Sequence, residues 1–217
     1  MDFAKQRQIM VDSQVRVNDV TSTAVVSAFS TIPREVFVPK SMLSSAYAEY
    51  EIETGENRAM WTPRDLGKMF RALEPEASDV SLVIAAGDGY SAALLGHMTE
   101  AVIALDDDEA LVDSMTERFA AINMDEAVAV QGEIAKGLPD QGPFDVVLVA
   151  GMVEEVPQVW LDQLAESGRL GVVVASGRSL GKARIYKRAG DTFAFREAFE
   201  CCPPVLPGFE KKTAFVF

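Results

Sequence analysis

Histidine and cysteine, which supply many metal ligands and nucleophiles, are almost missing from this chain of 217 residues. Its one histidine is His97, and its two cysteines are the adjacent Cys201 and Cys202. Neighbouring residues of a strand point to opposite faces, so we expect no disulfide between the two cysteines. This usage favours a reducing, cytoplasmic location, and the sequence predicts no metal site.

Positive charge is also scarce. The chain has 20 Lys and Arg against 33 Asp and Glu, which gives a formal net charge of -13 at pH 7. No Lys- or Arg-rich stretch offsets this negative field, which repels nucleic-acid phosphates. We therefore expect no nucleic-acid substrate, and we interpret the acidity as a means of keeping the protein in solution.

Long apolar runs, internal repeats and low-complexity linkers are missing too. The first ten residues include Asp2 and no continuous apolar run, so we expect neither a signal peptide nor a membrane anchor. With 48% hydrophobic and 24% charged residues, the composition is typical of globular proteins. Length and even composition predict a single domain over residues 1–217.

The front of the chain, residues 1–75, has the pattern of a helical cap. Its apolar spacing predicts helices over residues 3–13, 21–31, 41–47 and 63–73, with a polar loop over residues 51–57. Pro33 and Pro39 bracket a fixed connector, because proline is excluded from helix interiors and pushes the residue before it toward extended geometry.

Residues 76–217 have the pattern of an α/β core. Five short apolar runs predict parallel strands, over residues 80–86, 102–105, 128–130, 144–150 and 170–175, and helices lie between them over 91–98, 109–122 and 156–165. Further strands are expected over residues 182–188, 193–201 and 213–217. The prediction is a Rossmann-like α/β fold whose sheet is mostly parallel, with antiparallel carboxyl-terminal strands.

A glycine turn, Ala86-Gly87-Asp88-Gly89-Tyr90, joins the first strand of the core to its helix. In a doubly wound sheet ligands bind above this turn, where glycine leaves space because it has no Cβ. Asp106 ends the next strand, 19 residues after Gly87, where a carboxylate can accept hydrogen bonds from both hydroxyls of a ribose. We expect Asp107 or Asp108 to cap the following helix instead.

The loop after the third strand, Gln131-Gly132-Glu133, borders the same crevice in this architecture. Glu133 either accepts a hydrogen bond from the exocyclic amine of an adenine or is a solvated loop carboxylate. The sequence leaves both roles open.

Several strings of residues carry a resemblance to a known family. They are residues 10–16, Asp19-Val20, residues 32–39, Ala46-Tyr47, residues 88–94, 143–149 and 157–164, and Gly168-Arg169-Leu170. Over almost the entire chain they resemble the protein-L-isoaspartate O-methyltransferases. The resemblance implies S-adenosyl-L-methionine (AdoMet) as methyl donor, a cofactor turn containing Ala85, Gly87, Asp88 and Gly89, and isoaspartyl residues of damaged proteins or peptides as acceptors, an activity of protein repair.

The chain departs from that family near the expected reaction centre. The family's Thr-Ile-Ser-x-Pro segment aligns with residues 59–63, so Trp61 replaces a serine expected near the acceptor carboxylate. An indole donates only through its one N–H. Trp61 therefore either packs the cap against the sheet or lines a remodelled acceptor pocket, and Thr62 supplies the lost hydroxyl if the backbone is shifted by one residue. The catalytic residues are otherwise unassigned.

Other departures affect the cofactor turn. Ala85 stands where the family has a glycine, and Val83 stands where it has an acidic residue. The loop after the third strand has Gln131-Gly132-Glu133 where the family has an acidic residue followed by glycine. The Cβ of Ala85 narrows the approach to the turn.

Three hypotheses follow for the function. The first is the isoaspartate methyltransferase. The second is a methyltransferase for another acceptor, with Trp61 lining a site for an apolar or cationic group. The third is a catalytically silent binding module.

A carboxylate is already ionised at neutral pH and needs positioning more than a base, so His97 is not expected to be catalytic. The oligomeric state and the role of residues 203–207 stay open.

Overall fold

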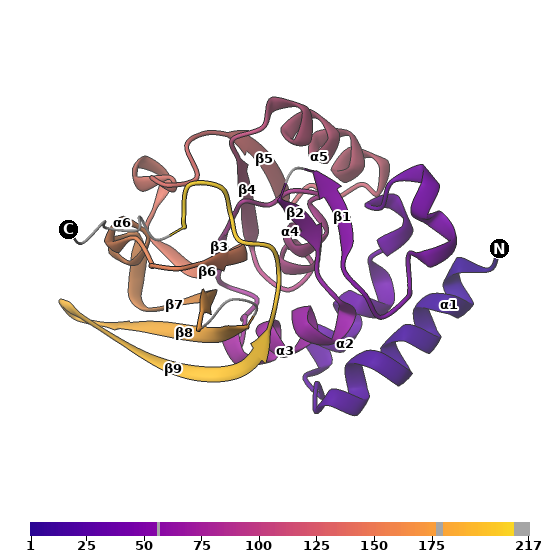
Figure 1. Ribbon diagram of the computed structural model, residues 1–217, viewed down its shortest axis with the longest axis horizontal. Helices are drawn as coiled ribbons and strands as arrows, with labels where there is room; N and C mark the ends of the chain where they lie inside the picture. Colours follow the sequence, from indigo (N-terminus) through magenta and orange to yellow (C-terminus); the bar gives the residue numbers. More distant parts are fainter. Residues whose placement is uncertain (56, 177–179, 211–217) are drawn as a thin grey trace, which may run out of the picture.

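The protein is built around one large sheet, seen in a computed structural model that describes residues 1–55, 57–176 and 180–210 (Figure 1). In the described part, this sheet has seven strands in the order β5-β4-β3-β6-β7-β8-β9. They are β3 (Val80–Ile84), β4 (Ala101–Asp106), β5 (Ala127–Gln131), β6 (Phe144–Val153), β7 (Leu164–Ala175), β8 (Gly181–Ala189) and β9 (Thr192–Cys201).

The sheet confirms the predicted fold class. Strands β3 to β7 pair in parallel, and β8 and β9 add antiparallel pairs at one edge. The chain runs outward from β3 through β4 to β5 and then returns to place β6 on the other side of β3. This reversal makes a crevice at the carboxyl ends of β3 and β6, which is where ligands bind in open α/β sheets.

Helices cover both faces of the sheet: α3 (Pro63–Leu73), α4 (Tyr90–Gly96), α5 (Glu109–Ala121) and α6 (Gln158–Asp162). Successive residues of β3 point to opposite faces. Val83 enters the hydrophobic cluster that contains α3, α4, α5 and the cap, whereas Leu82 and Ile84 enter the cluster that contains Trp160 of α6. The sheet therefore has two separate cores, and the cap lies over only one of them.

The cap is helical, as predicted, but less regular. Helix α1 (Phe3–Met10) continues through a π-helical turn (Val11–Val15) and a 3-10 turn (Arg16–Asn18) before α2 (Thr23–Thr31). The helix expected over 41–47 is a 3-10 helix at Lys40–Ser45. The connector holds a buried arginine, Arg34, which donates to the carbonyls of Ala46 and Trp61 at 2.8 Å each and so fixes the cap to the segment before α3.

Part of the loop expected over residues 51–57 is instead a strand. Strand β1 (Ile52–Gly55) pairs with β2 (Arg58–Met60) in an antiparallel hairpin that forms a sheet of its own. Ile52 and Met60 at its base are buried, so the hairpin is anchored by two apolar residues inside an otherwise polar segment. A pattern that short carries no clear period of two, which is why the sequence did not predict it.

One expected helix is shorter than predicted, and one expected strand cannot be compared with the structure. The helix expected over 156–165 ends at Asp162, because Leu164 already pairs with Phe144 as the start of β7. Strand pairing overrides the local helical spacing there. The strand expected over residues 213–217 lies outside the described residues. Within the described ranges, no helix has the length and apolar character needed to cross a membrane.

Candidate functional site

The turn between β3 and α4 has a left-handed backbone at three positions. Ala85, Gly87 and Gly89 have φ values of 57°, 57° and 86°. This conformation is easy for glycine and strained for alanine. Ala85 thus keeps the backbone shape of a glycine although it carries a Cβ, and the turn retains the form that brings the backbone close to a ligand.

The two glycines of this turn have different tasks. A Cβ at Gly89 would lie 2.9 Å from Cγ of Met115, so Gly89 allows α4 to pack closely on α5. A Cβ at Gly87 would instead point at the side chain of Arg58, with its nearest atom 3.6 Å away. Only Gly87 faces the crevice where a ligand is expected.

Asp106 lies beside that turn, as the sequence predicts. Its carboxylate is fully buried at the end of β4 and accepts hydrogen bonds from the backbone N–H of Gly87 at 2.9 Å and of Asp108 at 3.2 Å. Asp108 caps α5 by accepting from the backbone N–H of Ala110 at 2.9 Å, which confirms the capping role expected for one of the two following aspartates.

Arg58 is the residue that the sequence reading missed. From β2 its guanidinium reaches Asp106 through Nε and Nη2, both at 3.3 Å, and Nη2 also donates to Asp107 at 2.8 Å. Arg58 is 5% exposed. The only local sign of it is a basic residue after the turn residues Gly55 and Asn57, a signal too common to indicate a site.

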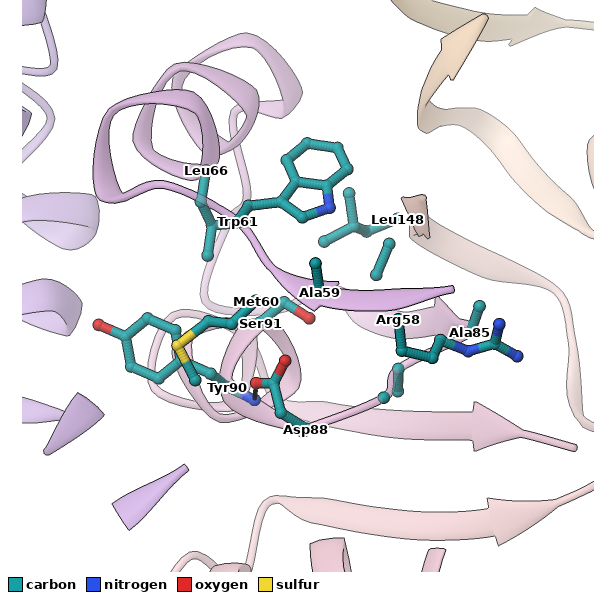
Figure 2. A pocket seen from close by; sticks show the side chains of 13 residues that line it. Arg58, Ala59, Met60, Trp61, Leu66, Ala85, Asp88, Tyr90, Ser91 and Leu148 are labelled. Atoms are coloured by element: carbon teal, nitrogen blue, oxygen red, sulfur yellow. Dashed lines mark hydrogen bonds between the residues drawn. The ribbon is translucent and has the colours of Figure 1, made fainter. Parts of the chain in front are cut away.

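A pocket lies between the hairpin and the glycine turn (Figure 2). Arg58 and Ala85 lie at one end of it and Tyr90 at the other. Its lining consists of Arg58, Ala59, Met60, Trp61, Leu66, Ala85, Ala86, Gly87, Asp88, Tyr90, Ser91, Leu148 and Ala150. The centre of a water molecule can reach only about 10 Å³ of it, which is room for about one water.

Trp61 lines this pocket and Thr62 serves the helix that follows. The indole of Trp61 is 4% exposed, and its N–H has no hydrogen-bond partner among the described residues. Figure 2 shows the indole nitrogen on the side that faces Leu148. The hydroxyl of Thr62 accepts from the backbone N–H of Asp65 at 3.1 Å and so caps α3. Thr62 is therefore already engaged and does not line the pocket.

Asp88 brings a buried carboxyl group to the floor of the pocket. It accepts from the backbone N–H of Tyr90 at 2.8 Å. Burial raises the pKa of Asp88 to about 6, while the Tyr90 N–H and the charges of Arg34 and Arg118 act in the opposite direction. Arg34 lies over the Tyr90 ring, 5.0 Å from its centroid, so a buried cation lies close enough to lower the pKa of this buried acid.

The remaining predicted positions lie around the edge. Gly132 donates its N–H to the carbonyl of Asp106 at 3.0 Å, which places that loop next to β4. Glu133 is exposed and pairs with Lys136 at 2.6 Å, outside the pocket. Val83, where the resemblance leads one to expect an acid, is fully buried in the core. His97 is exposed and lies 3.2 Å from the hydroxyl of Ser27, away from the site.

The stretch over residues 203–207 rests on the end of β6. Leu206 is fully buried and packs against Gly151, where an added Cβ would lie 2.4 Å from Cδ2 of Leu206. The carbonyl of Pro204 accepts from the backbone N–H of Met152 at 2.9 Å. This stretch thus borders the crevice from the side opposite α4.

Comparison with known proteins decides the family. Residues 5–202 match the family described as Protein-L-isoaspartate(D-aspartate) O-methyltransferase (PCMT). This chain belongs to the PCMT family. The same membership was expected from the strings at the front and middle of the sequence, and it is confirmed.

Similar proteins cover most of this PCMT-family chain. It is 34% identical over 192 residues to a protein-L-isoaspartate O-methyltransferase of Roseiflexus castenholzii, with 88% of this chain and 87% of the relative covered. It is 29% identical over 205 residues to one of Methanoculleus marisnigri, with 94% and 93% covered.

Solved structures support the fold. A protein-L-isoaspartate O-methyltransferase superposes with a TM-score of 0.80 at 23% identity, covering 94% of this chain and 65% of that chain. A Plasmodium falciparum protein, described as a candidate member and crystallised with S-adenosyl-L-homocysteine, superposes with a TM-score of 0.80 at 15% identity. The superposition covers 92% of this chain and 97% of that chain. At these identities the likeness shows the PCMT-family fold.

The polar groups at the site of this family member suit an adenosyl ligand, but the space beside them is occupied. Gly87 leaves the backbone open, Asp106 offers a charged acceptor, and the N–H of Trp61 lacks a partner. However, Arg58 fills the position beside Gly87 and Asp106, and the pocket holds about one water. With the hairpin in this position, Arg58 occupies the place beside Gly87 and Asp106 that a ribose would take.

Proposed function

We propose that this protein transfers a methyl group from AdoMet to the carboxylate of L-isoaspartyl residues in proteins or peptides, an activity of protein repair. The observation that carries the proposal is the PCMT-family match over residues 5–202. The relatives with 34% and 29% identity bear that enzyme's name. The glycine turn and the buried Asp106 at the carboxyl ends of β3 and β4 support an adenosyl site.

Each residue that we assign to the cofactor has a physical role. Asp106 would accept hydrogen bonds from the ribose, and Gly87 would let the ligand approach the backbone. Ala85 and Asp88 would shape the floor of the site, and Gly132 and Glu133 its edge. AdoMet would supply an electrophilic methyl group, and the acceptor carboxylate needs no base, because it is ionised at neutral pH.

A second candidate function is supported by Arg58. Since its guanidinium lies on Asp106 and the pocket is nearly filled, the chain has features of a binding module that keeps the fold without methyl transfer. A third, methyl transfer to another acceptor, is supported by Trp61, which presents a flat apolar ring where the family has a serine. Such a ring suits an apolar or cationic group.

Labelled methyl transfer separates these candidates. Purified protein is incubated with methyl-labelled AdoMet and either an isoaspartyl peptide or the same peptide with a normal aspartyl residue. We expect base-labile label on the isoaspartyl peptide alone. Binding of S-adenosyl-L-homocysteine (AdoHcy) without transfer to either peptide would refute the isoaspartate function and favour another acceptor. No binding at millimolar ligand would favour the silent module.

We also propose a cytoplasmic location, which the scarcity of cysteine supports. The net charge of -13 supports the absence of a nucleic-acid partner. Fractionation of cells that express the protein tests the location. A gel-shift titration with duplex DNA at low salt tests the partner, and retention at micromolar protein would contradict the proposal.

A further inference from the structure

All four strong acceptor positions of the Asp106 carboxylate are taken when the hairpin is closed. Oδ2 accepts from the backbone N–H of Gly87 at 2.9 Å and from Nε of Arg58 at 3.3 Å. Oδ1 accepts from the backbone N–H of Asp108 at 3.2 Å and from Nη2 of Arg58 at 3.3 Å. A carboxylate offers about four such positions. The backbone donors orient the carboxylate, and Arg58 takes the two positions that remain.

The stem of Arg58 covers the other half of the adenosyl site. Its Cβ and Cδ lie 3.6 Å and 3.7 Å from the point where a Cβ of Gly87 would be. The space that Gly87 leaves beside the backbone is therefore filled by the aliphatic part of Arg58. Arg58 thus places two donors on Asp106 and an apolar stem against the turn. A ribose bound there would likewise place its two hydroxyls on Asp106 and its carbon atoms against the turn.

We propose that Arg58 is an internal competitor for the cofactor site: the β1–β2 hairpin closes that site by placing the guanidinium on Asp106, and an adenosyl ligand binds only after Arg58 has left. This inference rests on the proposed function, because it takes the ligand to be AdoMet or AdoHcy. It assigns to Arg58 the role of setting the affinity of the site.

The hairpin is held by fewer strand pairings than the main sheet. Its two strands, β1 and β2, pair only with each other within the described residues, and their register is irregular between Glu53 and Gly55. A two-stranded hairpin has little stability of its own. The buried residues Ile52 and Met60 anchor its base, so opening would move Arg58 while the base stays in the core.

A hollow next to the hairpin offers Arg58 another place. It is lined by Arg58, Asp107, Asp108, Leu111 and Pro207, and the centre of a water molecule can reach about 230 Å³ of it. Nη2 of Arg58 already donates to Asp107 at 2.8 Å, and the Asp107 side chain is 53% exposed. A turn of the guanidinium toward this hollow would keep the pair with Asp107 and release Asp106. The charge of Arg58 would thus stay partnered in both positions.

Calorimetric titration with AdoHcy tests the proposal on the full chain. Arg58→Gln removes the charge and the two-pronged contact, and we expect it to bind AdoHcy at least tenfold more tightly than the wild type. Arg58→Lys keeps the charge but cannot hold both oxygens as a fork, so its affinity should lie between the two. Arg71→Gln is the matched control, because Arg71 is an exposed arginine whose pair with Asp19 is 3.9 Å long.

The outcomes are distinct. An unchanged or weaker affinity in a folded Arg58→Gln would overturn the proposal, since a merely structural arginine would alter thermal stability and not the affinity. If Arg58→Gln does not fold, an affinity of Arg58→Lys at or below that of the wild type would overturn it. Tighter binding without methyl transfer to the isoaspartyl peptide by any variant supports the inference and refutes the proposed function. No binding by any variant refutes both.

Discussion

Arg58 and Asp106 are 48 residues apart in the chain and form a buried ion pair, with Nε and Oδ2 3.3 Å apart and the two side chains 5% and 0% exposed. The pair joins the hairpin of the cap side to the end of β4. Buried pairs of this kind add little net stability against an apolar alternative, although removal of one partner is costly. The pair is therefore better explained by a role at the site than by stabilisation of the fold.

Asp106 is expected to contribute directly to ligand binding. Asp106→Asn, made in the Arg58→Gln background to remove the competing guanidinium, should weaken AdoHcy binding at least tenfold, because a neutral amide replaces a charged double acceptor. Calorimetry of the double and single variants measures the difference. Asp108→Asn in the same background is the control, since Asn caps helices as well as Asp does. Equal dissociation constants for all three would remove Asp106 from the site.

Ala85 is expected to limit the stability of the glycine turn. Ala85→Gly should raise the free energy of unfolding by roughly 0.5–1 kcal/mol, because relief of the left-handed backbone outweighs the greater freedom of glycine in the unfolded chain. Ala86, which is buried and lacks a positive φ, gives the matched control. Ala86→Gly should lower the free energy of unfolding by about 1 kcal/mol. Urea denaturation measures both. A loss of stability in Ala85→Gly would contradict the strain argument.

The two tryptophans should respond differently to loss of their N–H groups. The indole of Trp61 has no partner among the described residues, whereas that of Trp160 donates to the carbonyl of Ile134 at 2.9 Å. Trp160→Phe removes a hydrogen bond and leaves the carbonyl of Ile134 with the N–H of Gly137 at 3.2 Å, so it should be less stable than Trp61→Phe by about 0.5–1.5 kcal/mol. Denaturant unfolding followed by circular dichroism compares them. Equal losses would mean that Trp61 has a partner in solution.

The buried carboxyl of Asp88 should make stability depend on pH. Burial raises its pKa from 3.8 to about 6, so the folded state holds the proton more tightly than the unfolded state. The stabilisation from that proton is complete below pH 3.8 and is lost as the pH rises through about 6. Asp88→Asn keeps an oxygen for the Tyr90 N–H. Its free energy of unfolding relative to that of the wild type should therefore rise by up to about 3 kcal/mol between pH 4 and pH 7.

The Asp88 comparison is made by urea denaturation of both proteins at each pH. Glu51, whose pKa burial raises to about 7, titrates in the same direction in both proteins and cancels in the difference. A difference that does not change with pH would show that Asp88 is ionised or protonated equally in the folded and unfolded states.

We propose that the cap (residues 1–75) and the core (residues 76–217) unfold as one unit. Phe37 of the connector packs on Tyr90 and Phe119, with ring centroids 5.5 Å and 6.4 Å apart, so the two parts share one aromatic cluster. Tryptophan fluorescence and far-ultraviolet circular dichroism should give coincident unfolding curves. Phe37→Ala should shift both curves together and lower the free energy of unfolding by about 3–5 kcal/mol. Separate transitions would indicate two domains.

Much of the fold could be predicted because its signals are local. The runs at β3 and β6 are predominantly apolar, as is typical of parallel strands buried on both faces. Helix α3 was predicted at its observed bounds, Pro63–Leu73, from a proline start. The short helix α6 was overestimated, because its apolar spacing fits a longer helix and only pairing of Leu164 with Phe144 ends it.

The site was predictable only in part. Gly87 and Asp106 follow from a known spacing along two strands, and the structure brings them within 2.9 Å. The sequence left Glu133 open between an adenine contact and a solvated loop carboxylate, and the structure shows its exposed side chain paired with Lys136. Arg58 gave no signal, because the meaning of a single arginine depends on what lies opposite it.

The amino-acid sequence by itself determined the succession of strands and helices in the core, the turn at Gly87 and the family, because periodicity, glycine positions and short strings are properties of neighbouring residues. Only the tertiary structure decided that Arg58 faces Asp106 across 48 residues, that Thr62 caps a helix and that the pocket is nearly full. Contacts between distant segments depend on how the whole chain packs, and a short two-stranded hairpin can take its place over a site only once the sheet and cap exist.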